Sequence, residues 1–313
     1  NSLDEINEGY LRFIKTLKEY SDFSQTVLFN NLWASPKKRM RLAICVRTVN
    51  ELEERWNLFN KLVQQSGLIN TQGLNIKGIY FGEGDALTSD KAAWMFPGQA
   101  SQYPNMLKEI YEGYPQIESL YTQVNALWKA RYGNEIMPLI FGDDEEHLKK
   151  ELINTRNTHP AVFLSDIAMF KLLTESGVKA DYMIGHSLGE IAALYAGGML
   201  DLKSAVALAG ERGMAFDSIP EESRGLMMSI MADRPQVEEM IARSGLNLSL
   251  ANINSPEQTV IGGKQDQILR MEEYLSQNGV LFKRLGVSHA FHTELVSQAA
   301  ESFYSKIKDM VFD

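Results

Sequence analysis

The segment DYMIGHSLGEIAALYAG, residues 181–197, carries the most specific pattern in the chain. Its apolar start predicts a short strand, and EIAALYAG predicts a helix directly after it. Between them, GHSLG at 185–189 matches the G-x-S-x-G nucleophile elbow, a sharp strand-to-helix turn that exposes a reactive serine. Both glycines suit this turn because a side chain there would crowd the backbone. We therefore expect an α/β fold with Ser187 as nucleophile and the backbone N–H of Leu188 facing developing negative charge.

A serine nucleophile needs a base, and the chain has five histidines. His147 lies in the charged run DDEEHLKK and is predicted to be solvated, while His186, next to Ser187, would project away from its Oγ. His289 and His292, in VSHAFHT, remain as candidates for the base. Their H-x-x-H spacing could also bind a metal, but no Glu-x-x-His or cysteine partner accompanies it. We expect no metal.

The pattern along the chain predicts two domains, the second of them interrupted. Residues 1–90 read as a small α+β unit, and the strand AAWMF opens a larger domain at residue 91. In that domain His159-Pro160 predicts the start of a long apolar helix. Residues 222–288 read as strand, helix, strand, strand, helix and strand, the βαββαβ order of a ferredoxin-like unit. We assign 91–221 and 289–313 to the larger subdomain.

Composition excludes several classes of partner. The net charge of −9 argues against a nucleic acid, which needs a basic face. Cys45 is the only cysteine, so an intrachain disulfide and a thiolate zinc cluster are excluded, which suits a reducing cytosol. No apolar run approaches the roughly 20 residues that span a bilayer, and the polar start has no signal-peptide shape. We predict a cytoplasmic protein with no membrane partner. The start without methionine suggests a piece of a longer protein.

Five motifs carry a resemblance that covers residues 92–296. They follow one another as FPGQASQ at 96–102, GHSLGE at 185–190, ERGMAF at 211–216, NINSPEQTVIGG at 252–263 and SHAFHT at 288–293. Together they resemble the malonyl-CoA:acyl carrier protein transacylases and, more closely, the acyltransferase domains of polyketide synthases. Polyketide, polyunsaturated fatty acid and enediyne synthases all remain possible parents.

The resemblance implies a fold, a reaction and a site. The fold is an α/β-hydrolase-like large subdomain with a parallel sheet and an inserted ferredoxin-like small subdomain. The reaction moves a malonyl unit from malonyl-CoA to an acyl carrier protein in ping-pong order, with no resident cofactor, because the phosphopantetheine belongs to the carrier protein. Ser187 would be the nucleophile and His292 the base. Gln99 and Leu188 would supply the oxyanion-hole N–H groups.

The resemblance also assigns the substrate pocket. Arg212 falls where the family holds the free carboxylate of malonate, and a charge partner is needed there because the pocket is dry. HAFH in this family goes with malonyl rather than methylmalonyl selectivity, with Phe291 crowding an α-methyl branch. The remaining residues placed in the pocket by resemblance are His186, His289 and Gln102.

Residues 1–90, particularly RMRLAICVRTVNELEERW at 39–56, resemble the linker that joins a ketosynthase to an acyltransferase, which implies an adjacent ketosynthase domain on the same polypeptide. Two positions depart from the family pattern. Ala100 replaces a usual glycine, and His159 replaces a usual glutamine. The family also continues beyond residue 313 into a strand whose loop orients the base, so we expect a C-terminally truncated chain with reduced activity.

Two other readings stay open at this point. A serine esterase or lipase shares the elbow and the serine-before-histidine order, and it requires an acid between the two. Asp217, Asp233 and Asp266 are available, but none has a context that marks a triad member. The other reading is a catalytically silent scaffold segment of a synthase.

Overall fold

The computed structural model describes residues 3–19, 40–46, 48–66, 74–83 and 91–310. The chain forms two compact units, Asn1–Asp90 and Lys91–Asp313. None of the helices in the described ranges is both long and apolar enough to cross a membrane. Within the stretch at 39–56 that resembles a ketosynthase linker, residues 39 and 47 lie outside the described residues.

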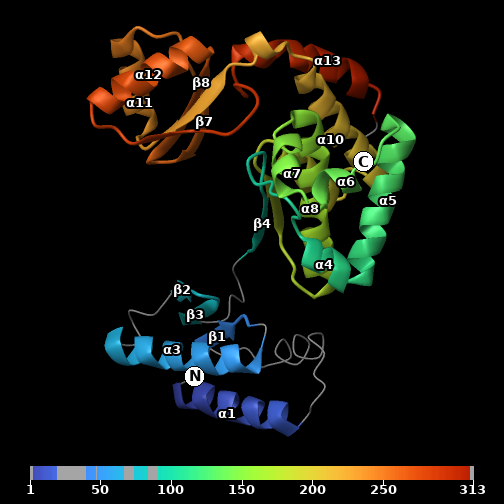
Figure 1. Cartoon of the computed structure of the whole chain (residues 1–313), viewed down its shortest axis with the longest axis vertical. Coiled ribbons are helices and arrows are strands. Elements are labelled where there is room, and N and C mark those ends of the chain that lie inside the picture. Colours follow the sequence, from blue (N-terminus) through green and yellow to red (C-terminus); the bar gives the residue numbers. More distant parts are fainter. Residues whose placement is uncertain (1–2, 20–39, 47, 67–73, 84–90, 311–313) are drawn as a thin grey trace. The chain divides into compact units, whose positions relative to one another are not determined.

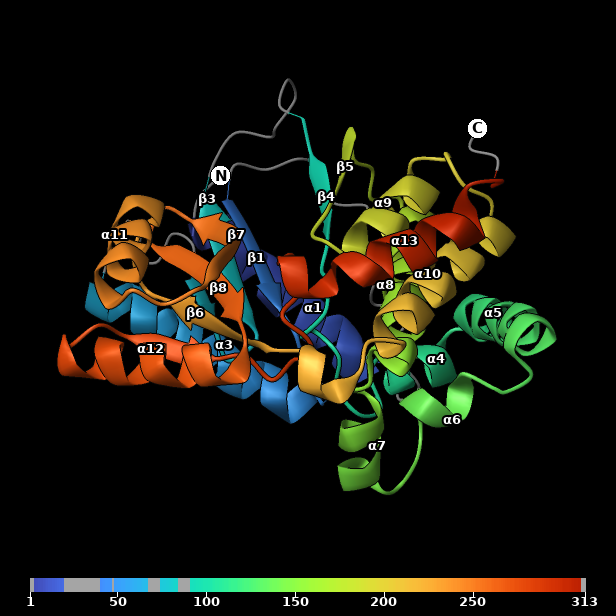
Figure 2. The same cartoon turned by 90° about the horizontal axis from the view of Figure 1, so that it is seen from above.

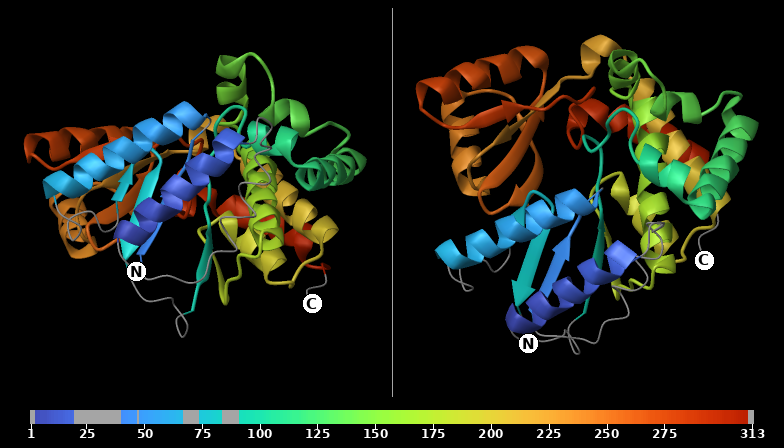
Figure 3. Two further views of the ribbon diagram at one scale, coloured as in Figure 1. Left: turned by 90° about the horizontal axis from the view of Figure 1, so that it is seen from below. Right: turned by 60° about the horizontal axis from the view of Figure 1, so that its bottom comes forward.

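Within its described residues, the first unit is a three-stranded antiparallel sheet with two helices. Its elements are α1 (Leu3–Glu19), β1 (Met40–Ile44), α3 (Val49–Ser66), β2 (Leu74–Ile76) and β3 (Ile79–Glu83), and the strand order is β1-β3-β2. Both helices and the sheet contribute to one apolar core around Trp56, Phe59 and Phe81 (Figure 3). The ring of Tyr10 on α1 stacks on Trp56 with centroids 3.9 Å apart. Strand β2 is absent from the sequence-based prediction.

The large subdomain of the second unit is mostly helical. It comprises β4 (Ala93–Phe96), α4 (Lys108–Gly113), α5 (Pro115–Tyr132), α6 (Met137–Ile140), α7 (Glu145–Glu151), α8 (Thr155–Glu175), β5 (Tyr182–Gly185), α9 (Gly189–Ala196), α10 (Leu202–Asp217) and α13 (Ser297–Ile307). Within the described residues its sheet has two parallel strands, β4 and β5. Helices α5, α8 and α10 pack around a core that includes Trp128, Phe163 and Leu208 (Figure 1).

Helix α8 begins earlier than the sequence predicts. It starts at Thr155, where the side chain of Asn154 accepts a hydrogen bond from the N–H of Arg156 at 3.2 Å. The sequence-based start at His159-Pro160 was wrong because Pro160 lies inside the helix rather than at its first position. In this extra turn Thr155, Asn157 and Thr158 are buried, and His159 after them is fully buried as well.

The small subdomain has the βαββαβ order that the sequence predicts. Its elements are β6 (Leu226–Ile230), α11 (Arg234–Ser244), β7 (Ser249–Ser255), β8 (Gln258–Gly263), α12 (Gln265–Gln277) and β9 (Phe282–Arg284). The strands are antiparallel in the order β7-β8-β6-β9. Both helices share a core with the sheet, which includes Val237, Ile268 and Ile261 (Figure 2). This is the arrangement of a ferredoxin-like unit.

The small subdomain is joined to the large one by two segments that contact each other. The outgoing segment passes through a 3₁₀ turn at Glu221–Ser223, and the returning segment follows β9. The N–H of Ala290 on the returning segment donates to the carbonyl of Arg224 on the outgoing one at 2.6 Å. Gly225, the next residue of the outgoing segment, has a φ of 67°. A Cβ at this position would meet the carbonyl of Gly263 and the Ala290 side chain. The two passages are therefore fastened side by side.

One carboxyl group lies in the interior of the large subdomain. Asp166 on α8 is 8% exposed, and its Oδ2 has no hydrogen-bond partner in the part of the chain that the structure describes. Burial raises the pKa of Asp166 to about 8. The side chain is therefore mostly protonated at neutral pH.

We expect Asp166→Asn to flatten the pH dependence of stability. An unfolded aspartate titrates near pH 3.9, so between about pH 4 and pH 8 the folded state keeps a proton that the unfolded state has lost. The free energy of unfolding then falls as the pH rises, by up to about 1.4 kcal/mol per pH unit from this group. Asparagine does not titrate. Urea unfolding of both proteins across this range should show the variant gaining relative stability as the pH rises, and parallel curves would contradict the assignment.

Candidate active site

The elbow around Ser187 depends on two close backbone approaches. Strand β5 ends at Gly185, Ser187 adopts a left-handed φ of 54°, and α9 begins at Gly189. A Cβ on Gly185 would overlap the backbone nitrogen of Glu190, and a Cβ on Gly189 would overlap the carbonyl of Phe96 on β4. Because neither glycine can be replaced without moving the backbone, the serine is held at the tip of the turn.

The loop after β4 closes against the elbow from the other side. A Cβ on Gly98 would meet the carbonyl oxygen of His186 at 2.5 Å, so the two loops touch backbone to backbone. The N–H of Ala100 donates to Oε1 of Gln102 at 2.8 Å, and the Gln102 amide donates to the carbonyl of Leu152 at 3.2 Å. These contacts fasten the segment that carries Gln99.

Ser187 and His292 meet although they are 105 residues apart in sequence. Their Oγ and Nε2 atoms are 2.9 Å apart. His292 has a φ of 60° and follows Ala290 and Phe291, which pack with Met227 and Val260 of the small subdomain. The returning segment after β9 thus places the imidazole of His292 beside the hydroxyl of Ser187. This is the geometry of a nucleophile and its general base.

The protonation state of His292 suits a base. Burial lowers its pKa first, Arg212 and His186 lower it further, and Glu190 acts in the opposite direction. The pKa therefore lies below the usual 6.5, and the ring is mostly neutral at pH 7. For Nε2 to accept the serine proton, the ring proton must lie on Nδ1.

A buried cation faces the same hydroxyl. The Nη2 of Arg212, on α10, donates to Ser187 Oγ at 3.1 Å. Burial lowers the pKa of Arg212 to about 10, with Glu190 raising it, so the guanidinium stays charged at neutral pH. No carboxylate of the described residues lies within ion-pair distance of this guanidinium. An anionic group of a substrate would supply the missing charge partner.

Two backbone N–H groups are candidates for an oxyanion hole. Leu188 follows Ser187 directly and precedes α9, and its side chain is buried. Gln99 lies in the loop that closes against the elbow. Within the described ranges neither N–H donates to another protein atom, so both are available to an oxyanion.

Sequence reasoning missed the role of His159. It is fully buried, and its Nε2 is 3.3 Å from Gln99 Oε1 and 3.3 Å from Arg212 Nη1. It therefore lies between Gln99 and the buried guanidinium of Arg212. The signal was a histidine directly before the apolar run PAVFL at 160–164, since a fully buried imidazole needs polar partners.

The chain is similar to known proteins. Residues 93–312 match the family described as acyl transferase domain. The chain belongs to this acyl transferase family. The malonyl CoA-acyl carrier protein transacylase of Bacillus subtilis is 35% identical over 228 residues, which cover 71% of this chain and 68% of that protein. Polyketide synthase GfsA of Streptomyces halstedii is 32% identical over 222 residues, but the chain spans only 3% of its length.

Solved acyltransferase structures resemble the chain as well. The acyltransferase domain from the second module of the salinomycin polyketide synthase has a TM-score of 0.69 and 26% identity, and the match covers 99% of this chain and 68% of that one. A malonyl-transacylase in complex with its type II polyketide synthase acyl-carrier protein has a TM-score of 0.64 and 28% identity over 72% of each chain.

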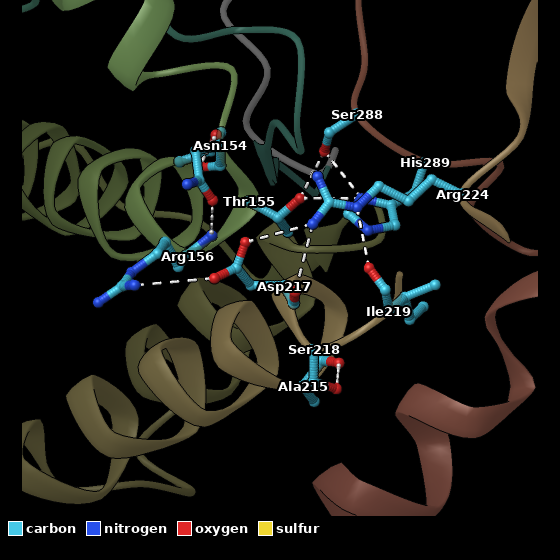
Figure 4. A network of polar contacts seen from close by, with 11 residues as sticks. Asn154, Thr155, Arg156, Ala215, Asp217, Ser218, Ile219, Arg224, Ser288 and His289 are labelled. Atoms are coloured by element: carbon cyan, nitrogen blue, oxygen red, sulfur yellow. Dashed lines mark hydrogen bonds and ion pairs between the residues drawn. The ribbon is translucent and has the colours of Figure 1, made fainter. Parts of the chain in front are cut away.

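Three further residues were assigned to the pocket from the acyl transferase resemblance: His186 directly precedes Ser187, and His289 and Phe291 are buried. His289 is 1% exposed, and its Nδ1 lies within hydrogen-bond distance of the hydroxyls of Ser288 and Thr155 (Figure 4). Burial, followed by Arg224, lowers the pKa of His289 to about 4. Phe291 is buried against Phe216, with ring centroids 4.9 Å apart.

Asp217 belongs to a polar network that joins the subdomains. Its carboxylate lies 3.7 Å from Arg156 and 3.7 Å from Arg224, and Arg224 also donates to the carbonyl of Ile219 (Figure 4). Of the other acids considered for a hydrolase triad, Asp233 caps α11. Asp266 accepts from Gln267 at the start of α12. Among the described residues none of the three is hydrogen-bonded to His292, so none of them completes the triad that a hydrolase requires. The described residues also contain no cluster of three potential metal ligands.

Opposite shifts of the His292 pKa should follow from removing each neighbouring charge. Arg212→Ala removes a cation that lowers the pKa, so the pKa should rise, whereas Glu190→Gln removes an anion and should lower it. NMR titration of the ring, assigned with His292→Ala, measures both. Arg234→Ala, on the exposed face of α11, is the matched control and should change nothing. Shifts of the same sign for both variants would contradict this electrostatic account.

Ala100→Gly should stabilise the loop that carries Gln99. Ala100 has a φ of 82°, where the methyl group destabilises the folded state by about 1–2 kcal/mol relative to glycine. The greater conformational freedom of glycine in the unfolded state offsets about 0.4–1 kcal/mol of this difference. The net gain should be roughly 0.5–1 kcal/mol in thermal or urea unfolding. The same substitution at exposed Ala126 in α5 should instead destabilise by about 1 kcal/mol. Equal losses at both positions would show that the loop does not favour glycine.

Proposed function

We propose that this chain transfers a malonyl group from coenzyme A to an acyl carrier protein. One observation carries the proposal: the Oγ of Ser187 lies 2.9 Å from the imidazole of His292 and 3.1 Å from the guanidinium of Arg212. A nucleophile thus has a base on one side and a buried cation on the other. The names of the relatives support this substrate class.

In the first half-reaction Ser187 Oγ attacks the thioester carbonyl and His292 Nε2 takes the hydroxyl proton. The oxyanion is held by the N–H groups of Gln99 and Leu188. The C–S bond then breaks, the coenzyme A sulfur leaves, and His292 returns the proton to it. The product is a malonyl ester on Ser187.

In the second half-reaction the thiol of the carrier protein's phosphopantetheine attacks that ester. His292 accepts the thiol proton and then protonates Ser187 as the C–O bond breaks, which restores the free enzyme. The two substrates therefore use one site in turn, and the kinetics should be ping-pong. This order needs no cofactor held by the chain.

Arg212 selects the carboxylated substrate. A guanidinium can bind a carboxylate through two parallel hydrogen bonds, and a charged hydrogen bond contributes about 1.5–3 kcal/mol. A neutral acetyl group leaves the buried cation unpaired. Phe291, buried beside Phe216, narrows the site against an α-methyl branch, which favours malonyl over methylmalonyl.

The parent protein is a polyketide synthase or a related multidomain synthase, with residues 1–90 as the linker to a ketosynthase domain. Two findings support this part of the proposal. The match to the salinomycin synthase domain covers 99% of the chain and so includes the first unit. Probable polyketide synthase 3 of Dictyostelium discoideum is 29% identical over 89% of the chain.

Intact-mass spectrometry after mixing with malonyl-CoA tests the transfer. We expect a malonyl adduct on the wild type, its loss in Ser187→Ala, and its disappearance when holo carrier protein is added. Rapid hydrolysis of a neutral p-nitrophenyl ester with no preference for malonyl-CoA would favour a hydrolase instead. No adduct and no hydrolysis would leave a scaffold.

Arg212→Ala should lower malonyl loading while sparing or raising acetyl loading. The loss should be about 10- to 150-fold in kcat/KM for malonyl-CoA, the equivalent of one charged hydrogen bond. Initial rates with both thioesters measure it, with Arg243→Ala, an exposed arginine of α11, as control. Equal losses for both substrates would show that Arg212 acts on structure and not on the carboxylate.

A further inference from the structure

His159 lies between two parts of the site that work on different ends of the substrate. Its ring is fully buried on α8, with Nε2 3.3 Å from Arg212 Nη1 and 3.3 Å from Gln99 Oε1. The ring of Phe216 meets it edge-on at 5.7 Å, and Nδ1 has no partner among the described residues. The position of the ring is thus set by packing, and only Nε2 faces polar groups.

The chemistry of the neighbours decides where the ring proton lies. A guanidinium has donors and no acceptor, so Arg212 can bond to Nε2 only if that nitrogen carries its lone pair. The proton must then be on Nδ1. A 180° turn of the Gln99 amide exchanges its oxygen and nitrogen, and the Gln99 Nε2 is otherwise buried without a partner in the described chain. With that turn, the Nη1 of Arg212 and the Nε2 of Gln99 both donate toward the lone pair of the unprotonated Nε2 of His159.

We propose that neutral His159 is a positioning residue that holds both Arg212 and Gln99 through its unprotonated Nε2. It thereby couples the cation that binds the substrate carboxylate to the loop that stabilises the oxyanion. The role rests on the proposed function, because it assigns the carboxylate to Arg212. His159 itself touches neither Ser187 nor the reacting carbonyl in this arrangement.

The surrounding charges agree with a neutral ring. Burial lowers the pKa of His159 well below 6.5, and Arg212 on α10 and His289 on the returning segment lower it further. No group that shifts its pKa acts in the opposite direction. A protonated ring would direct an N–H at the guanidinium, one cation against another, and would release Arg212.

The first test reads the tautomer directly. Two-bond ¹H–¹⁵N NMR spectra of the ¹⁵N-histidine-labelled wild type, assigned with His159→Gln, distinguish a protonated Nδ1 from a protonated Nε2. We expect the Nδ1–H form at pH 7. A proton on Nε2, or a cationic ring at that pH, would overturn the proposal even if every kinetic result agreed.

The second test uses a double-mutant cycle with His159→Leu and Arg212→Ala. His159→Leu keeps the volume but removes the acceptor, and it should lower the malonyl-to-acetyl ratio of kcat/KM about tenfold. In the Arg212→Ala background the same change should leave that ratio unaltered. His159→Gln, which offers a neutral acceptor, should restore most of the ratio lost in His159→Leu. An unchanged ratio in His159→Leu, or an equal fall in both backgrounds, would overturn the role.

The outcomes separate this role from the proposed function. If the wild type forms the malonyl adduct and His159→Leu keeps the wild-type ratio, the positioning role alone fails. If the wild type forms no adduct, the proposed function fails, and the part of the proposal in which His159 positions Arg212 for the substrate carboxylate fails with it. The tautomer would still report the contact between His159 and Arg212. Circular dichroism and thermal unfolding check that each variant folds. Should His159→Leu not fold, the tautomer of the wild-type ring still decides.

Discussion

The active site depends on a place where two backbones touch with no side chain between them. Gly189 and Gly98 each bring one loop against the other, so the β4 loop and the serine elbow form one unit. At this contact Ser187 has a left-handed φ of 54°, and the loop of Gln99 lies against the elbow of Ser187 and Leu188. Protein interiors transmit strain because they are close-packed, so small changes here would move the nucleophile itself.

A second constraint is the burial of a charge. Arg212 has lost most of its hydration, yet no carboxylate of the described chain pairs with it. Burial is the main cause that lowers the pKa of both His159 and His292, and the charge of Arg212 lowers both further. The guanidinium proposed to bind the substrate carboxylate therefore also favours the neutral form of the proposed base.

Local signals predicted the elbow and the order of the inserted unit, because each depends on short-range patterns. The glycines at 185 and 189, and the succession of strand-like and helix-like segments in residues 222–288, can be recognised from the sequence alone. The start of α8 was misread because a proline outweighed the asparagine cap before it. The His159 contact and the Asp217 network were not predicted, since their partners lie far away in the chain and only folding brings them together. The resemblance supplied His292 and Arg212, where residue patterns alone left two histidines open.

The fastening of Arg224 to Ala290 has an evolutionary consequence. Because the chain leaves and re-enters the large subdomain at one spot, the inserted unit is a cassette whose outer helices can diversify without altering the spacing of serine and imidazole. A fold built this way separates the adaptation of its contacts from the preservation of its reaction.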